Sequence, residues 1–296
     1  MNYKYNIYNY NIDSNYKFNT LNEHFINTSN IKLINIEYKR DIVDKASVVD
    51  IYDNNDFAIQ FSGLIRFNYK NSINQLTCMA QNPIYVNEYI TNAPFSILTS
   101  QSKGVLLHGS VLIINDKAYA FLAPCGVGKS TLLFSLLQFE NVYYFSDDAV
   151  ALYVENGKEV VYRGSPKIKV NKDVLQFHNV STRNLLRTSE LKGKFYIQLD
   201  DKIYRKEKCY LEKVFILSRS DIYTDVVINN LSGYRVMPNL LRGTVGYQNL
   251  CGNEKIRKLI LSNLHGICNT LNLFLMSIPN NMFVYNRRFI DLITKC

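Results

Sequence analysis

One short stretch constrains the fold of this chain more than any other. Residues 123–131 read Ala-Pro-Cys-Gly-Val-Gly-Lys-Ser-Thr. They fill the last three fixed places of the pattern G-x-x-x-x-G-K-[ST] with Gly128, Lys129 and Ser130, while Ala123 stands for the first glycine. An apolar run of strand length precedes the motif, and the run after it keeps apolar residues on one helical face. The sequence therefore predicts a strand, a tight loop and the start of a helix.

Such a loop is suited to phosphate groups. Its backbone N–H groups and the positive end of the helix dipole point at one position, which fits a nucleoside triphosphate. We expect Lys129 to reach the β and γ phosphates and the Ser130 hydroxyl to hold Mg²⁺. The residues predicted to bind the nucleotide are Ala123, Pro124, Cys125, Gly126, Val127, Gly128, Lys129, Ser130 and Thr131.

Two carboxylates follow the next apolar run. Asp147 and Asp148 come directly after residues 142–146, at the exit of a predicted strand. A strand of this kind places a metal ligand and a base beside the phosphates. We assign Asp147 as the base that accepts the hydroxyl proton and Asp148 as the metal ligand with Ser130, and the opposite assignment stays open. Because side chains alternate along a strand, the two carboxylates should face different partners.

A histidine interrupts the apolar run that precedes the loop. His108 is followed by Gly109, where another backbone can approach closely. A histidine at this place can serve a functional site or only satisfy the core, and both alternatives stay open. The pair Asn115-Asp116 between the two apolar runs predicts a hairpin whose second strand leads into the loop.

Composition narrows the classes of partner and compartment. The formal net charge of +9 suits anionic ligands, but the basic residues are spread thinly and predict no nucleic-acid partner. Six cysteines without C-x-x-C spacing fit a reducing cytoplasm rather than a zinc site or a disulfide framework. The first ten residues lack the apolar core of a signal peptide. Polar residues break the apolar stretch 259–278, so we expect a buried helix and strand there and no membrane span.

The chain divides into two predicted domains. Residues 1–102 carry short Tyr-, Ile- and Phe-rich runs with turn residues between them, typical of a β-rich module for docking or oligomerisation. Two strands are expected to meet near Ser62-Gly63. A further strand is expected at residues 83–86 and a helical connection at residues 88–102. Residues 103–296 form the predicted α/β catalytic domain, with a helix expected over 173–189. The sequence leaves open whether the chain forms a homo-oligomer.

The order of these elements resembles a known family. The series LLHGSVLI, hairpin, APCGVGKST, helix, FSDDAV and YRGSP, over about residues 100–170, is similar to the HPr kinase/phosphorylase family. It is closer to the smaller HPr-kinase-related kinases found with peptide natural-product genes. The resemblance implies a mixed sheet flanked by helices, with His108 near the acceptor hydroxyl. It also implies roles near the phosphates for Arg163, with Gly164 after it, and for Lys194 at a strand start.

The chain also departs from that family. Val161 and Tyr162 stand where the HPr kinases have a glutamate before the Arg-Gly pair. The long basic C-terminal signature that serves the reverse reaction is missing. We therefore do not carry over phosphorylation of HPr itself or phosphorylase activity.

The expected function is that of a phosphotransferase with an alcohol group as acceptor. It would use ATP and Mg²⁺ and transfer the γ-phosphoryl group to a Ser or Thr of a peptide or protein in a peptide natural-product pathway. A small alcohol stays open as the acceptor. The alternatives are a nucleotide-gated accessory protein that binds a peptide, and a simple NTPase. An acceptor that gains a phosphate distinguishes the kinase from both.

Overall fold

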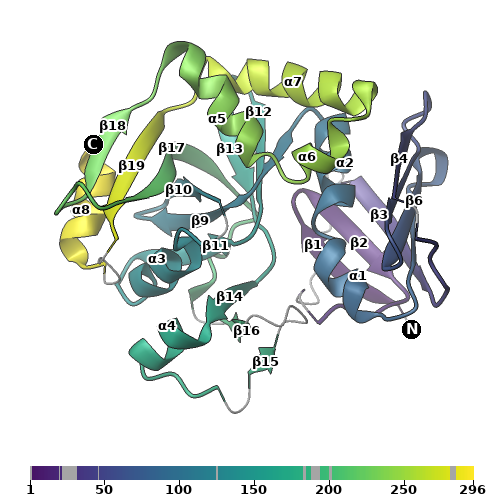
Figure 1. Ribbon diagram of the computed structural model, residues 1–296, viewed down its shortest axis with the longest axis horizontal. Coiled ribbons are helices and arrows are strands. Elements are labelled where there is room, and N and C mark those ends of the chain that lie inside the picture. The colour runs from purple at the N-terminus through teal and green to yellow at the C-terminus, as the bar shows by residue number, and fades with distance from the viewer. Residues whose placement is uncertain are drawn as a thin grey trace. The chain divides into compact units, whose positions relative to one another are not determined.

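The computed structural model describes residues 2–19, 21, 32–45, 47–124, 126–182, 185–187, 194–199, 202–280 and 285–296 (Figure 1). The chain forms two compact units, Met1–Leu106 with Thr244–His265, and Leu107–Gly243 with Gly266–Cys296. The sequence boundary between residues 102 and 103 falls close to this division. Residues 244–265, which the sequence places in the second domain, cluster with the first unit.

The first unit is built on a sheet whose described strands follow the order β1-β2-β3-β7-β6-β5-β4. The pairs β2–β3 and β3–β7 are parallel, and the remaining neighbours are antiparallel. The strands are β1 (Tyr3–Ile7), β2 (Tyr10–Ser14), β3 (Lys32–Lys39), β4 (Val48–Ile51), β5 (Phe57–Phe61), β6 (Ile65–Lys70) and β7 (Gln75–Met79). The helices are α1 (Ile84–Tyr89), α2 (Ala93–Gln101), α6 (Tyr247–Leu250) and most of α7 (Glu254–Cys268).

Turn residues fix two hairpins of this sheet. Gly63 has φ +67° between β5 and β6, at the turn that the sequence predicts. Tyr8 and Asn9 both have positive φ between β1 and β2, a hairpin that we did not predict. The strand expected at residues 83–86 is wrong, because α1 begins there. Pro83 precedes the helix with its φ already helical, and the Asn82 side chain accepts a hydrogen bond from the Ile84 N–H.

The second unit contains the larger mixed sheet. Its described strands follow the order β11-β9-β10-β17-β13-β12-β8, and β19 continues the sheet from β17 with β18 beside it. Strand β17 pairs in parallel with β10 and β19, whereas β9 pairs antiparallel with β10 and β11. The strands are β8 (Val105–Leu107), where the two units divide, β9 (Gly109–Ile114), β10 (Lys117–Leu122), β11 (Val142–Ser146), β12 (Val150–Glu155), β13 (Lys158–Tyr162), β17 (Lys208–Ser220), β18 (Val227–Asn230) and β19 (Leu273–Pro279).

A small antiparallel sheet belongs to the same unit. It has the order β14-β16-β15, with β14 (Lys167–Asn171), β15 (Leu186–Arg187) and β16 (Lys194–Gln198). The helices of the unit are α3 (Lys129–Leu136), α4 (Lys172–Phe177), α5 (Val236–Gly243) and α8 (Arg287–Lys295). The helix expected over 173–189 is therefore too long. Asn179 has φ +57° and ends α4, and β15 lies in the remainder of the range.

The predicted strand–loop–helix around the motif is confirmed in its element types. Strand β10 leads into the loop, and α3 begins at Lys129. The hairpin before it is also confirmed, with positive φ at both Asn115 and Asp116. Stacked rings of Phe121, Phe215 and Phe274 join β10, β17 and β19. Buried residues of α3 and α8 pack into the same hydrophobic cluster as these strands, which anchors the start of α3 at the sheet.

The apolar stretch 259–278 forms the end of α7 and the strand β19. Among the described residues, no helix has the length and apolar character needed to cross a membrane.

Candidate functional site

The segment that the sequence predicts to bind phosphate, residues 123–131, is called the phosphate loop below. It leaves β10 and is shaped by two glycines. Gly126 has φ +90°, and Gly128 has φ +108° directly before α3, a region that residues with a Cβ rarely adopt. A Cβ at Gly128 would also lie 2.7 Å from an Nη atom of Arg219. Glycine is therefore required at this position by its conformation, and a larger residue would also displace the Arg219 guanidinium. Cys125 lies outside the described residues.

Arg219, at the end of β17, ties the loop to the sheet. Its Nε donates to the Val127 carbonyl at 2.9 Å and its Nη1 donates to the Pro279 carbonyl at 2.9 Å. The guanidinium therefore connects the loop to the ends of β17 and β19. The sequence analysis missed Arg219, because the residue lies far along the chain from the loop and no motif links the two.

Lys129 is buried, with 7% of its surface exposed. Its ammonium donates to the Ala123 carbonyl at 2.6 Å and to the Pro124 carbonyl at 3.2 Å, and it lies 3.2 Å from His108 Nε2. The lysine predicted to reach the phosphates thus lies folded against its own loop. A buried charge needs partners of this kind, because burial removes its hydration.

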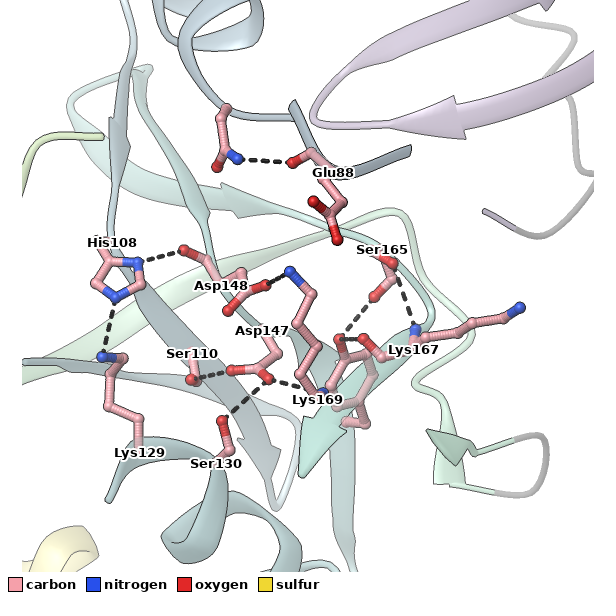
Figure 2. Close-up of polar contacts among 12 residues, drawn as sticks. Glu88, His108, Ser110, Lys129, Ser130, Asp147, Asp148, Ser165, Lys167 and Lys169 are labelled. Atoms are coloured by element: carbon pink, nitrogen blue, oxygen red, sulfur yellow. Dashed lines mark hydrogen bonds and ion pairs between the residues drawn. The ribbon is translucent and has the colours of Figure 1, made fainter. Parts of the chain in front are cut away.

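His108 lies between β8 and β9 and joins the lysine to the strand exit (Figure 2). Since an ammonium only donates, Nε2 accepts from Lys129, and Nδ1–H donates to the Asp148 carbonyl at 2.9 Å. Burial and the Lys129 ammonium lower the pKa of His108 below its ordinary value. The imidazole is therefore neutral at pH 7. Glycine is needed at position 109, because a Cβ there would lie 2.8 Å from the backbone carbonyl oxygen of Phe121.

Asp147, just after β11, faces the phosphate loop. Its carboxylate accepts from the Ser110 hydroxyl at 2.6 Å and from the Ser130 hydroxyl at 3.3 Å. The backbone N–H of Lys169 lies 3.4 Å from the same oxygen as Ser130. Only 3% of Asp147 is exposed. Burial, together with the neighbouring Asp148 carboxylate, raises the pKa of Asp147.

Asp148 faces a different partner. Its backbone is left-handed, with φ +68°, and its carboxylate forms an ion pair with Lys169 Nζ at 2.5 Å. Burial by itself would raise the pKa of Asp148, but the Lys169 ammonium, together with His108 and Lys194, lowers it. Figure 2 shows the two carboxylates pointing apart, one toward Ser110 and Ser130 and the other toward Lys169.

Lys169 is a second site residue that the sequence analysis missed. It lies on β14 opposite Tyr196 of β16, and its ammonium is 5.6 Å from the centre of the Tyr196 ring. Burial would lower the pKa of Lys169, but Asp148, Tyr196 and Asp147 together raise it, so the side chain stays charged. The alternation of Lys167, Ile168, Lys169 and Val170 was the available signal, because it places two lysines on one face of a strand.

The two remaining predicted residues lie in different surroundings. Arg163 forms an ion pair with Glu207 at 2.6 Å, and its backbone N–H donates to the Glu207 carbonyl. The N–H of Gly164 donates to the carbonyl of Phe145 in β11, the strand that leads to the aspartates. Lys194 begins β16, and its charge contributes to the lowered pKa of Asp148.

The oxygen atoms of Ser130 and Asp147 are donors of the kind that Mg²⁺ prefers. Among the described residues, no group of three or more His, Cys, Asp or Glu side chains could enclose a metal ion. Mg²⁺ does not need such a cage, because it is usually bound by one or two protein oxygens together with phosphates and water. The donor set at the loop therefore fits Mg²⁺ bound with a nucleotide.

The chain was compared with known proteins. No family model matches it, and no curated protein matches it. Among solved structures, it is similar to the Hpr(Ser) kinase/phosphatase from Coxiella burnetii, with a TM-score of 0.33 and 13% sequence identity. The match covers 64% of this chain and 86% of that chain. A similarity this distant carries no argument about activity.

Proposed function

We propose that the second unit is a P-loop kinase domain. It binds ATP with Mg²⁺ at residues 123–131 and transfers the γ-phosphoryl group to the hydroxyl of a Ser or Thr in a peptide or protein. The observation that carries the proposal is the contact of Asp147 with Ser130 beside the buried Lys129, while Asp148 points away from them. This arrangement provides one carboxylate beside the predicted metal position and a second carboxylate for the acceptor hydroxyl.

The geometry supports an exchange of the two aspartate roles that the sequence suggested. Asp147 lies 3.3 Å from the hydroxyl expected to hold Mg²⁺, so we assign it with Ser130 to the metal side. Asp148 is more exposed, and its lowered pKa keeps it ionised at neutral pH, the form that can accept a proton. We therefore propose Asp148 as the base.

The reaction then proceeds by direct transfer. The acceptor oxygen attacks the γ-phosphorus, the bond from that phosphorus to the oxygen shared with ADP breaks, and the hydroxyl proton moves to Asp148. Bound Mg²⁺ would supply charge neutralisation at the phosphates. Lys129 turns from the carbonyls of Ala123 and Pro124 toward the phosphates, because they are stronger partners for an ammonium than neutral carbonyls. His108 holds the Asp148 backbone through Nδ1–H and so positions the base.

Mass spectrometry tests this proposal. The protein is incubated with ATP, Mg²⁺ and Ser-containing peptides of varied composition, with ADP and free phosphate measured in parallel. A product heavier by one phosphate supports the kinase. Release of free phosphate with no modified acceptor would favour the simple NTPase. Nucleotide binding with neither product would favour the accessory protein that binds a peptide.

A further inference from the structure

The small sheet beside Asp148 carries an unusual concentration of one charge. Residues paired across antiparallel strands share a face, and the register pairs Lys169 with Tyr196 and Asn171 with Lys194. Lys167 is two residues from Lys169 and therefore lies on the same face. This face, which we call the lysine face, thus carries Lys167, Lys169, Asn171, Lys194 and Tyr196. It holds no acidic residue among the described positions of β14 and β16.

The Lys169 side chain of the lysine face borders the base, whereas the Lys169 backbone N–H faces Asp147. The Lys169 ammonium pairs with Asp148 at 2.5 Å, and the charge of Lys194 acts on the same carboxylate. The loop serine contacts the other carboxylate, Asp147. A group that approaches Asp148 from the side of β14 therefore meets the Lys169 ammonium at the base and the added positive charge of Lys194.

We propose that the lysine face binds the acceptor, and that the acceptor is a peptide segment whose Ser or Thr is flanked by Asp or Glu. This inference rests on the proposed function. Residues two apart on a strand are about 6.6 Å apart, the spacing of alternate residues in an extended peptide. Carboxylates on either side of the acceptor hydroxyl would then pair with the lysines while the hydroxyl reaches Asp148. The formal net charge of +9 adds a general attraction for such a segment.

Charge-matched peptides test the inference. Three synthetic peptides carry one Ser flanked by Glu, by Gln or by Lys, and kcat/KM is measured for each with saturating ATP and Mg²⁺. We expect the Glu peptide to exceed the Gln peptide by about tenfold, as two partly exposed ion pairs would give. In Lys167→Glu and Lys194→Glu this ratio should fall toward one, and the Lys peptide should gain. Because the ratio compares two acceptors, an effect on the nucleotide cancels.

A matched control is Lys158→Glu, which reverses an exposed charge at the start of β13 in the same unit. Its ratio should equal that of the unmodified protein. An unmodified protein that shows no preference for the Glu peptide would overturn the inference. So would a Lys194→Glu protein that binds ATP more weakly but keeps the ratio, because Lys194 would then serve the nucleotide.

A binding measurement separates this inference from the kinase proposal. The same peptides with Ala in place of Ser are labelled, and their affinity is followed by fluorescence anisotropy at low and high salt. If the Glu peptide binds and the lysine variants release it while no peptide is ever phosphorylated, the lysine face stands as a docking surface for acidic peptides and the kinase proposal fails. If all Ser peptides are phosphorylated equally and no Ala peptide binds by charge, the kinase stands and the docking face fails.

Discussion

The two units differ in what they bury. The buried polar residues of the first unit are uncharged: Asn11, Ser14, Gln60, Asn87, Ser96, Thr99, Ser100 and Thr244. Among the described residues, the buried charged side chains all belong to the second unit, at Lys129, Asp147 and Lys213. Burying a charge is costly unless partners replace its water, so a protein keeps one only where something compensates for it.

The three buried charges are compensated in two different ways. The Lys213 ammonium donates to the carbonyls of Ile293 and Thr294 in the last turn of α8, where a cation also favours the helix dipole. Its role is complete within the fold. Lys129 and Asp147 both contact residues of the phosphate loop, and we propose that both act on a bound ligand. Burial of a charged side chain therefore does not by itself identify a functional site. The partners of that side chain show whether its role lies in the fold or at a site.

The largest expected effect separates the two aspartates. Asp147→Asn and Asp148→Asn should each lower kcat by about 10²- to 10⁴-fold, the usual contribution of a positioned acid or base. Asp148→Asn should leave ATP affinity near normal, whereas Asp147→Asn should raise the Mg²⁺ concentration needed for half-maximal activity. Mg²⁺ titrations and ATP binding for both variants check this. The reverse pattern would restore the assignment made from sequence, with Asp147 as the base.

The next effect compares two buried lysines. Lys129→Ala should lower kcat/KM for ATP by about 10²- to 10³-fold, because it removes the ammonium that we propose turns to the phosphates. Lys213→Met removes an equally buried charge, and it should leave kcat/KM close to that of the unmodified protein. Steady-state kinetics with circular dichroism as a folding control give the measurement. Near-normal turnover by Lys129→Ala would remove the phosphate loop from the mechanism.

The stability of the fold should depend on Lys213, the buried lysine whose partners are all within the fold. Lys213→Met leaves helix-terminal carbonyls without their donor and should lower the free energy of unfolding by about 1 to 3 kcal/mol. The control is Lys117→Met, which removes an exposed partner of Glu212 and should change stability by less than about 1 kcal/mol. Denaturant titration measures both. Equal effects of the two substitutions would mean that the buried contacts of Lys213 do not stabilise the fold.

The smallest effect concerns the first unit. The Ser96 hydroxyl is fully buried and donates to the Val245 carbonyl at 2.8 Å. Ser96→Ala should lower the free energy of unfolding by about 1 kcal/mol and leave phosphoryl transfer unchanged. Ser72→Ala, at an exposed position, is the control for stability. A large loss of transfer in Ser96→Ala, with the stability loss as expected, would show that the neutral polar groups of this unit also serve the activity.

Local signals in the sequence were sufficient for the elements around the phosphate loop. The glycines at 126 and 128, the Asn115-Asp116 turn and the apolar runs on either side act over a few residues, so their conformations follow from nearby chain. The same local reasoning failed at residues 83–86 and 173–189. There the apolar pattern fitted more than one element, and Pro83 and the left-handed Asn179 decided the outcome.

The sequence by itself determined that a strand, a glycine-containing loop and a helix follow one another, and that two carboxylates follow at the next strand exit. Only the tertiary structure decided which partners those carboxylates face. The strand β14 brings Lys169 to Asp148, and β17 brings Arg219 to the loop, from places distant along the chain. Such contacts depend on strand register and on which sheet each strand joins. Register is set by the packing of many side chains together, so no single motif encodes it.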